Sequence, residues 1–420
     1  MGVSDVGSGS FDAVPEHPTI TIRALAKKPI SVQVNRVARA FIMMGLVSWL
    51  CACVECPRAP GLSARQCESL AALELPSAPP PARGNRVAED ERAALLGFEV
   101  FFDARLSRDG SVRCASCHLP ERVFGDGRAT SQGLVAVDRN SPSLYGAAWH
   151  RWQMWDGRAD SLWSQPLLAF ENENEMDFTR LELAHRVKAT YQVPYEALFG
   201  ALPPLEVAAR FPPRGKPGLP AWEAMSEADR AAVDLVVANV GKALEAYQRK
   251  LAFKPGRFDD FVSGGAQRLT ADEVAGLGLF LARGCAECHS GPLLSDDDFH
   301  AIGLIDEPPR ARAQALVTLA ASAFTAAGAF FDGEKESLPA ARPQDDGAYR
   351  TPTLRNVGRT GPWGHDGRFE TLQAAVEAHW KLPPGVSAPM TPTELEQLVV
   401  FLNALDATDP SLPWNGWPDR

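Results

Sequence analysis

The chain has 420 residues, which is enough for two or three domains of ordinary size. Hydrophobic residues make up 45% of it and charged residues 22%, so the composition is that of a globular protein and excludes global disorder. The formal net charge is −10, which excludes the basic surplus typical of a nucleic-acid-binding protein.

The first part of the chain resembles an export signal. A basic segment precedes an apolar stretch at residues 40–53, and this stretch is shorter than the about 20 residues that cross a bilayer. This order is the form of a secretory signal, and the ending LCAC resembles a bacterial lipobox with the lipid on Cys53. We therefore expect residues 1–53 to direct export to the periplasm, either free or membrane-anchored. The alternative is a buried N-terminal helix.

Between this segment and the body, residues 54–84 are rich in proline, above all in the run PSAPPPARG. Such a composition is typical of an extended, unpacked linker, so we expect the folded body to begin near Asn85. Four of the eight cysteines lie before the body: Cys51, Cys53, Cys56 and Cys67. Whether these four form disulfides does not follow from the sequence.

The body is predicted to be mainly helical, with long loops. Residues 88–102 are amphipathic, and residues 226–252 form a long helical pattern with few breakers. Capping boxes predict two further helices, which begin after Thr270 and after Thr391. Segments rich in proline and glycine, such as residues 202–220, are predicted loops, and no region shows the sustained alternation of a strand.

Two CxxCH motifs carry the strongest chemical signal. They are Cys114-Ala-Ser-Cys117-His118 and Cys285-Ala-Glu-Cys288-His289. Two cysteines at this spacing can add to the vinyl groups of a haem, and the adjacent histidine then binds the iron. The alternatives are a redox CxxC pair or a shared zinc site, and the second histidine and the export signal argue against both. We therefore expect two covalently bound c-type haems in two similar, cytochrome c-like domains, residues 85–264 and 265–420.

Several strings make the sequence resemble the bacterial dihaem cytochrome c peroxidase/MauG family over most of residues 85–407. They are RNSPSL at 139–144, WDGRAD at 155–160, FHAIG at 299–303, TPTLRN at 351–356 and HDGRFETL at 365–372. In that family the first haem reacts with peroxide, and the second stores and relays electrons. The resemblance implies that His118 is the proximal ligand of the peroxide-reacting haem and His289 that of the relay haem.

The family also places a glutamine ten and a glutamate twenty residues after the WDGR tryptophan. Here that tryptophan is Trp155, and the two positions hold Gln165 and Glu175. A glutamate above an open iron can move the proton of the peroxide from one oxygen to the other, and Gln165 can orient the peroxide by hydrogen bonding. Taken alone, Glu175 belongs to an acidic run typical of a surface, but its spacing from Trp155 favours the catalytic role.

The resemblance further implies an electron path and a calcium ion. Trp155 is expected to lie between the haems as a step in electron hopping. Three neighbouring tryptophans are expected to pack around the haem instead: Trp149, Trp152 and Trp163. The residues that match the calcium site of the family, with one side-chain amide and two backbone carbonyls as oxygen ligands, are Asn140, Thr360 and Pro362.

One departure from the family concerns the first haem. Many of its peroxidases have, after a Ser-x-Gly string, a loop histidine that blocks the active iron in the oxidised state. Here the string SQG is followed by Leu134, which cannot bind iron. His150 lies beyond that position, and we expect it to be a surface or propionate-side residue.

The other departure concerns the second haem, whose distal ligand in the family is a methionine, or a tyrosine in MauG. The matching position here is His379, and a bis-His iron should have a lower potential than a His/Met iron. The alternative is a helical histidine that faces solvent. Two other histidines, His300 and His365, are expected to be structural or propionate-side, and His17 and His185 ordinary surface residues.

The expected function is therefore that of a dihaem c-type peroxidase, which reduces H2O2 with electrons from a small periplasmic c-type cytochrome or cupredoxin. One alternative is a MauG-like dihaem oxidase, which uses a ferryl state to oxidise a protein or organic substrate. His379 and the missing loop histidine favour it somewhat. The other alternative is a non-catalytic dihaem electron carrier, which Gln165 and Glu175 argue against. The family often forms homodimers, but the sequence decides neither the oligomeric state nor the donor.

Overall fold

The computed structural model describes residues 55–408 apart from residues 57–58, 266–267, 304–310 and 381–388. Within these residues the chain is mainly helical, as the sequence predicted, and its two small sheets are antiparallel pairs of strands. No helix in this part of the chain is long and apolar enough to span a membrane. The expected export segment, with the lipid site at Cys53, lies outside the described residues.

The segment before Asn85 differs from the unpacked linker that its proline content predicted. Its elements are β1 (Glu55–Cys56), β2 (Ala59–Ser63), α2 (Ala64–Ser69) and η2 (Leu70–Leu73). A disulfide joins Cys56 to Cys67. Apolar side chains of this segment are buried in the core that surrounds the second CxxCH motif, so the expectation that the folded body begins near Asn85 is wrong. Among the described residues of this segment, only residues 74–84 have neither helix nor strand.

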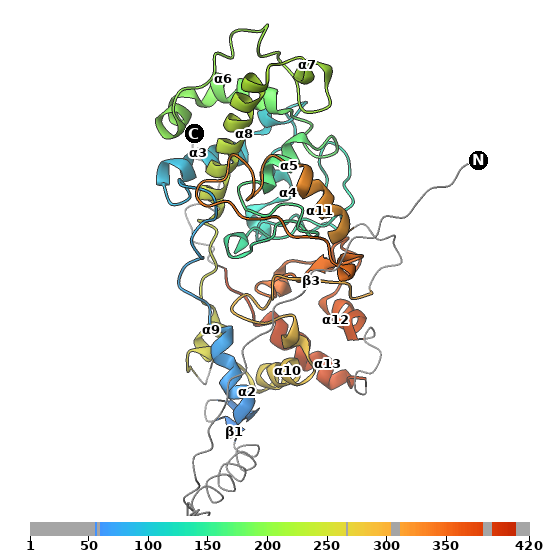
Figure 1. The fold of residues 1–420 in the computed structure, drawn as a ribbon. Helices are drawn as coiled ribbons and strands as arrows, with labels where there is room; N and C mark the ends of the chain where they lie inside the picture. The colour runs from blue at the N-terminus through green and yellow to red at the C-terminus, as the bar shows by residue number, and fades with distance from the viewer. Residues whose placement is uncertain (1–54, 57–58, 266–267, 304–310, 381–388, 409–420) are drawn as a thin grey trace, which may run out of the picture. The chain divides into compact units, whose positions relative to one another are not determined.

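The first hydrophobic core surrounds the first CxxCH motif. Its two main helices, α3 (Glu91–Phe102) and α8 (Glu227–Gln248), pack along each other (Figure 1). Gly97 permits this contact, because a Cβ there would lie 2.0 Å from the carbonyl oxygen of Ala243. Both helices confirm the predicted ones. The other helices of this part are η3 (Ala104–Leu106), α4 (Cys114–Cys117), η4 (Pro120–Arg122), η5 (Ala147–Trp149), α5 (Gln165–Glu171), α6 (Arg180–Phe199) and α7 (Pro220–Glu223).

The second core surrounds the second CxxCH motif. Here α10 (Ala271–Ala282) packs against α13 (Pro392–Asn403), and both begin with the capping boxes that the sequence predicted. Gly276 permits the contact, because a Cβ there would lie 2.1 Å from the carbonyl oxygen of Gln397. The remaining elements are α9 (Arg257–Val262), η6 (Cys285–Glu287), β3 (Phe299–His300), α11 (Arg312–Ala321), η7 (Pro343–Asp345), β4 (Tyr349–Arg350), η8 (Val357–Arg359) and α12 (Leu372–Trp380).

Each core contains side chains from the other side of the expected domain boundary at residue 264. Phe324 and Phe331, which follow α11 in the C-terminal half, are buried in the first core. Phe258 and Phe261 on α9 precede the boundary but are buried in the second core. The division into residues 85–264 and 265–420 therefore separates the two CxxCH motifs but not the two cores.

Candidate active site

Both CxxCH motifs have the chemistry that covalent haem attachment requires. The four thiols, Cys114, Cys117, Cys285 and Cys288, are free. Nδ1 of His118 lies 2.9 Å from the carbonyl oxygen of Phe124, and Nδ1 of His289 lies 3.0 Å from that of Leu294. Because a carbonyl only accepts, Nδ1 carries the proton in both histidines, and Nε2 has its lone pair available for iron. The two motifs therefore fit two c-type haems.

The surroundings of the two proximal histidines repeat in detail. Phe124 and Leu294 both adopt positive φ values, 56° and 51°, which turn their carbonyls toward the imidazoles. Burial lowers the pKa of His118, and burial also lowers the pKa of His289 to about 4. Both imidazoles are therefore neutral at physiological pH, which is the form that binds a metal.

Glu175 lies beside the first motif. Burial raises the pKa of its carboxyl, and Asn172 Nδ2 donates a hydrogen bond to Oε1 at 2.6 Å. Burial raises the pKa of Cys114 and of Cys117 to about 12, and the charge of Glu175 contributes to both shifts. The carboxyl is therefore within electrostatic reach of both thiols, unlike its neighbour Glu173, which is exposed. Gln165, at the start of α5, lies with Nε2 3.7 Å from the sulfur of Met154.

The loop that carries Leu134 runs between Glu175 and the first motif. The backbone N–H of Leu134 donates to the carbonyl of Glu175 at 2.9 Å, and Cys117 Sγ lies 3.7 Å from the carbonyl of Gln132. Gly133 allows this approach, because a Cβ there would lie 2.5 Å from the carbonyl oxygen of Asn174. The residue that replaces the family's loop histidine therefore lies next to the glutamate.

His379 lies near the second motif. It is on α12, and its Nδ1 is 2.8 Å from the carbonyl oxygen of Ala375, so its Nε2 has an available lone pair. The residue is exposed, but its charged form contributes to lowering the pKa of His289. The imidazole of His379 is therefore close enough to His289 for its charge to act on it.

Trp155 connects segments from both halves of the chain. Its Nε1 donates to the carbonyl of Asn140 at 2.9 Å, and its carbonyl accepts from the backbone N–H of Arg350 at 2.8 Å. Trp152 has two cationic groups against its ring. The guanidinium carbons of Arg312 and Arg151 lie 4.1 Å and 5.1 Å from the ring centre.

The other two neighbouring tryptophans are packing residues. Trp149 packs at 5.4 Å from the ring of Phe253, and Trp163 is fully buried in the first core. Both lie as expected for indoles that fill space.

Two of the three residues that match the calcium site lie at one cavity of about 210 Å³. Asn140 and Thr360 line it, and Pro362 follows the cis peptide bond after Gly361. Two cationic side chains, Arg122 and Arg359, line the same cavity.

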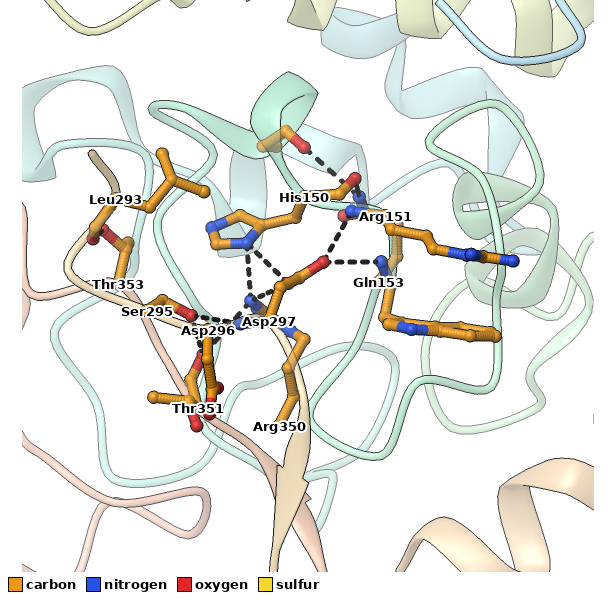
Figure 2. A network of polar contacts seen from close by, with 12 residues as sticks. His150, Arg151, Gln153, Leu293, Ser295, Asp296, Asp297, Arg350, Thr351 and Thr353 are labelled. Atoms are coloured by element: carbon orange, nitrogen blue, oxygen red, sulfur yellow. Dashed lines mark hydrogen bonds and ion pairs between the residues drawn. The ribbon is translucent and has the colours of Figure 1, made fainter. Parts of the chain in front are cut away.

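His150 was expected to be a surface or propionate-side residue, and the surface alternative is wrong. Its side chain is only 5% exposed and contacts Asp297 and Arg350 in a polar network (Figure 2). Asp297 and Arg350 are 147 and 200 residues away in sequence, so no local pattern could have predicted the contact.

The other histidines lie as follows. His365 stacks on Tyr349 at 4.0 Å, and His300 Nε2 lies 2.8 Å from Asp296 Oδ2. His185 is half-buried against the carbonyl of Pro212 rather than on the surface, and His17 is outside the described residues.

Two haem-attachment motifs with free thiols and oriented histidines, in a mainly helical fold, define a dihaem c-type cytochrome. The model of the di-haem cytochrome c peroxidase family matches residues 91–267. The chain is 32% identical over 368 residues to the methylamine utilization protein MauG of Methylorubrum extorquens, covering 82% of this chain and 89% of the relative. The chain therefore belongs to the dihaem cytochrome c peroxidase/MauG family of oxidoreductases, whose members carry two haems.

Two further relatives support this assignment. The chain is 31% identical over 358 residues to the cytochrome-c peroxidase IdrP1 of Denitromonas iodatirespirans, with 80% of this chain and 86% of the relative covered. The crystal structure of a MauG-like protein associated with microbial copper homeostasis matches with a TM-score of 0.57 at 27% identity. This match covers 82% of this chain and 99% of that one.

Proposed function

We propose that this protein is a peroxidase that reduces H2O2 to two water molecules, using two protons from the solvent and two electrons from a small exported c-type cytochrome or cupredoxin. The observation that carries the proposal is Glu175, a half-buried carboxyl beside the first CxxCH motif and next to a loop that offers Leu134 instead of a histidine. When bound, the haem at His118 supplies an iron that exchanges electrons with peroxide, and the haem at His289 supplies one that stores and passes on single electrons.

Glu175 acts as the acid–base group. Its carboxylate accepts the proton of one peroxide oxygen and returns it to the other, so that the departing oxygen leaves as water. Such a group works best when its pKa lies near the operating pH, and the burial that raises the pKa of Glu175 supports this role. Asn172 fixes the carboxyl through the 2.6 Å hydrogen bond, and Gln165 orients the peroxide with its amide.

Trp155 carries electrons between the two haem sites. A positive charge near an indole opposes the removal of an electron from it, and Trp152 has two guanidinium groups against its ring. Trp155 instead donates its N–H to a backbone carbonyl, which leaves the ring more electron-rich. This contrast supports Trp155, rather than Trp152, as the hopping residue.

His289 and His379 are proposed to be the two residues that would hold the iron of the second haem. The interaction between the two imidazoles supports this pair. Because imidazole favours ferrous iron less than a thioether does, the potential should be lower than that of a His/Met haem.

Export to the periplasm, with Cys53 as a possible site of lipid attachment, is also proposed. Disulfides persist in oxidising compartments and are rare in the cytosol, so the Cys56–Cys67 disulfide supports export.

A calcium ion held by Asn140, Thr360 and Pro362 is proposed from the family resemblance and from the cavity that Asn140 and Thr360 share. The charges of Arg122 and Arg359 at that cavity oppose a cation and lower its affinity. Metal analysis of the haem-loaded protein, and of an Asn140→Ala variant, tests the site.

The second candidate is a MauG-like oxidase of a protein or organic substrate, which the absence of the loop histidine at Leu134 and the presence of His379 favour. Stopped-flow mixing with H2O2, followed by a panel of reduced cytochromes and cupredoxins, separates the two functions. Rapid catalytic oxidation of a donor supports the peroxidase. Retention of the oxidising equivalents of peroxide for minutes, without donor turnover, supports the oxidase.

A further inference from the structure

A buried polar network joins the segment before Trp155 to the segment after the second CxxCH motif (Figure 2). The network consists of His150, Asp297 and Arg350, whose side chains are 5%, 18% and 10% exposed. Charges taken out of water are costly unless they are paired, so this arrangement is held by its partners. The proposed chemistry at the two haems makes no use of it.

Nδ1 of His150 lies next to one hydrogen-bond acceptor and one hydrogen-bond donor. It lies 2.8 Å from Asp297 Oδ1 and 2.8 Å from Arg350 Nη1, and these two atoms are 3.1 Å apart. A carboxylate only accepts hydrogen bonds, and a guanidinium only donates them. An unprotonated Nδ1 therefore accepts from Arg350, whereas a protonated Nδ1 donates to Asp297. The proton on Nδ1 decides which partner His150 binds.

Both partners are connected to the electron path. The backbone N–H of Arg350 donates to the carbonyl of Trp155 at 2.8 Å. Asp297 follows three residues after Leu294, whose carbonyl binds Nδ1 of His289. Asp297 also has a φ of 54°, a strained conformation that persists only where its surroundings require it. The network thus spans from the proximal side of the second haem site to the backbone of Trp155.

We propose that His150 is a positioning residue for Trp155 and fulfils this role only while its imidazole is neutral. The inference rests on the proposed function in that Trp155 carries electrons between the haems. When His150 is neutral with its proton on Nε2, Nδ1 accepts from Arg350, so Arg350 is held by both His150 and Asp297, and its backbone N–H holds Trp155. A doubly protonated His150 is a second cation beside Arg350, so the bond between them is replaced by repulsion, and Arg350 and Trp155 shift.

Burial and the charge of Arg350 favour the neutral form of His150, whereas the carboxylate of Asp297 opposes them and raises its pKa. Among the described residues, Asp297 and Arg350 are the charged side chains that contact its ring, whereas the guanidinium of Arg151 pairs with Glu336. Burial, followed by the charge of Arg350, lowers the pKa of His150. The positioning state is therefore present at neutral pH and is lost only in acid, below the usual histidine pKa of about 6.5.

Flash photoreduction of the oxidised, haem-loaded protein by a deazaflavin tests this without peroxide. One electron reduces one haem, and the rate at which it then passes to the other reports the path through Trp155. His150→Asn places an amide oxygen near the position of Nδ1, so it can accept from Arg350 but cannot titrate. His150→Phe removes both properties, and His185→Asn is a control that removes a distant histidine.

In the wild type and in His185→Asn, the transfer rate should fall by about 10-fold or more between about pH 8 and about pH 4, because displacing a group by about 1 Å costs up to about 10²-fold. His150→Asn should keep the neutral-pH rate throughout, and His150→Phe should be slow throughout. An acid decline that persists in His150→Asn, or a wild-type rate in His150→Phe, overturns the inference. If His150→Phe does not fold, the pH profile of His150→Asn decides.

A failure of this inference can be distinguished from a failure of the proposed peroxidase activity. A protein that passes electrons as predicted but does not turn over peroxide contradicts the proposed peroxidase and leaves the role of His150 standing. A protein that turns over peroxide but shows no effect of His150 contradicts this inference alone.

Discussion

Replacing Glu175 with glutamine removes the proposed acid–base group with little change of shape. The amide oxygen of glutamine can still accept the hydrogen bond that Asn172 Nδ2 donates to Oε1 at 2.6 Å. The contact between Leu134 and position 175 uses only the backbone, so it remains. We therefore expect Glu175→Gln to fold and to bind both haems.

The reaction with H2O2 should nevertheless slow greatly. A positioned acid–base group contributes about 10²–10⁴-fold to a rate, which is roughly 3–5 kcal/mol of activation free energy. The proposed base acts in its deprotonated form. Because burial raises the pKa of Glu175, the wild-type rate should begin to fall, as the pH is lowered, at a pH above the ordinary glutamate range. This acid decline should be absent in Glu175→Gln.

The Glu175→Gln variant should lose reaction rate but should not lose stability toward unfolding. A carboxyl whose pKa is raised by folding contributes stability that is present below its unfolded pKa and is lost as the pH rises through the folded value. Glu175→Gln should therefore unfold at the same or a higher temperature than the wild type at neutral pH. Lower activity with undiminished stability separates a catalytic role from a structural one.

Stopped-flow absorbance of the oxidised protein mixed with H2O2 measures the rate between about pH 4.5 and about pH 8. Glu173→Gln is the matched control, because Glu173 lies in the same acidic run but its side chain is 79% exposed. A rate constant in Glu175→Gln equal to that of the wild type, or equal losses in both variants, would refute the catalytic assignment.

Four further predictions concern other positions. Leu134→His should make the first haem low-spin in the oxidised protein and delay its reaction with peroxide until it is reduced; an unchanged spectrum contradicts the loop assignment. His379→Met should raise the potential of the second haem in a redox titration, and an unaltered potential would reject His379 as its ligand. Burial raises the pKa of Glu245 to about 7, and the stability that this provides is lost as the pH rises through that value. Glu245→Gln should thus gain ~3 kcal/mol at about pH 8 and little at about pH 4, and a gain independent of pH in denaturant titrations argues against this. Asn140→Ala should lower the bound calcium found by mass spectrometry, and equal metal content in both proteins would exclude Asn140 as a ligand.

The parts of the structure that follow local rules could be predicted from the sequence. The capping boxes at Thr270 and Thr391 begin helices because their hydrogen bonds join residues three apart. The two CxxCH motifs depend on equally short spacing, and each proximal histidine binds a carbonyl five or six residues later.

The parts that depend on contacts between distant segments could not be predicted. Residues 55–73 look like a linker by composition, but their apolar side chains are buried against the core around α10, which lies some two hundred residues later. Phe324 is buried in the first core although it belongs to the C-terminal half. The network of His150, Asp297 and Arg350 likewise exists only because the fold brings together three segments that are far apart in the sequence.

The central claim is that the His118 site is open to peroxide while the His289 site is closed by His379. Electron paramagnetic resonance of the oxidised, haem-loaded protein, before and after one equivalent of H2O2 without reductant, tests it most directly. The spectrum should contain one high-spin signal and one low-spin signal of bis-His character, and peroxide should remove the high-spin signal at once. Two low-spin signals that peroxide leaves unchanged would contradict the claim.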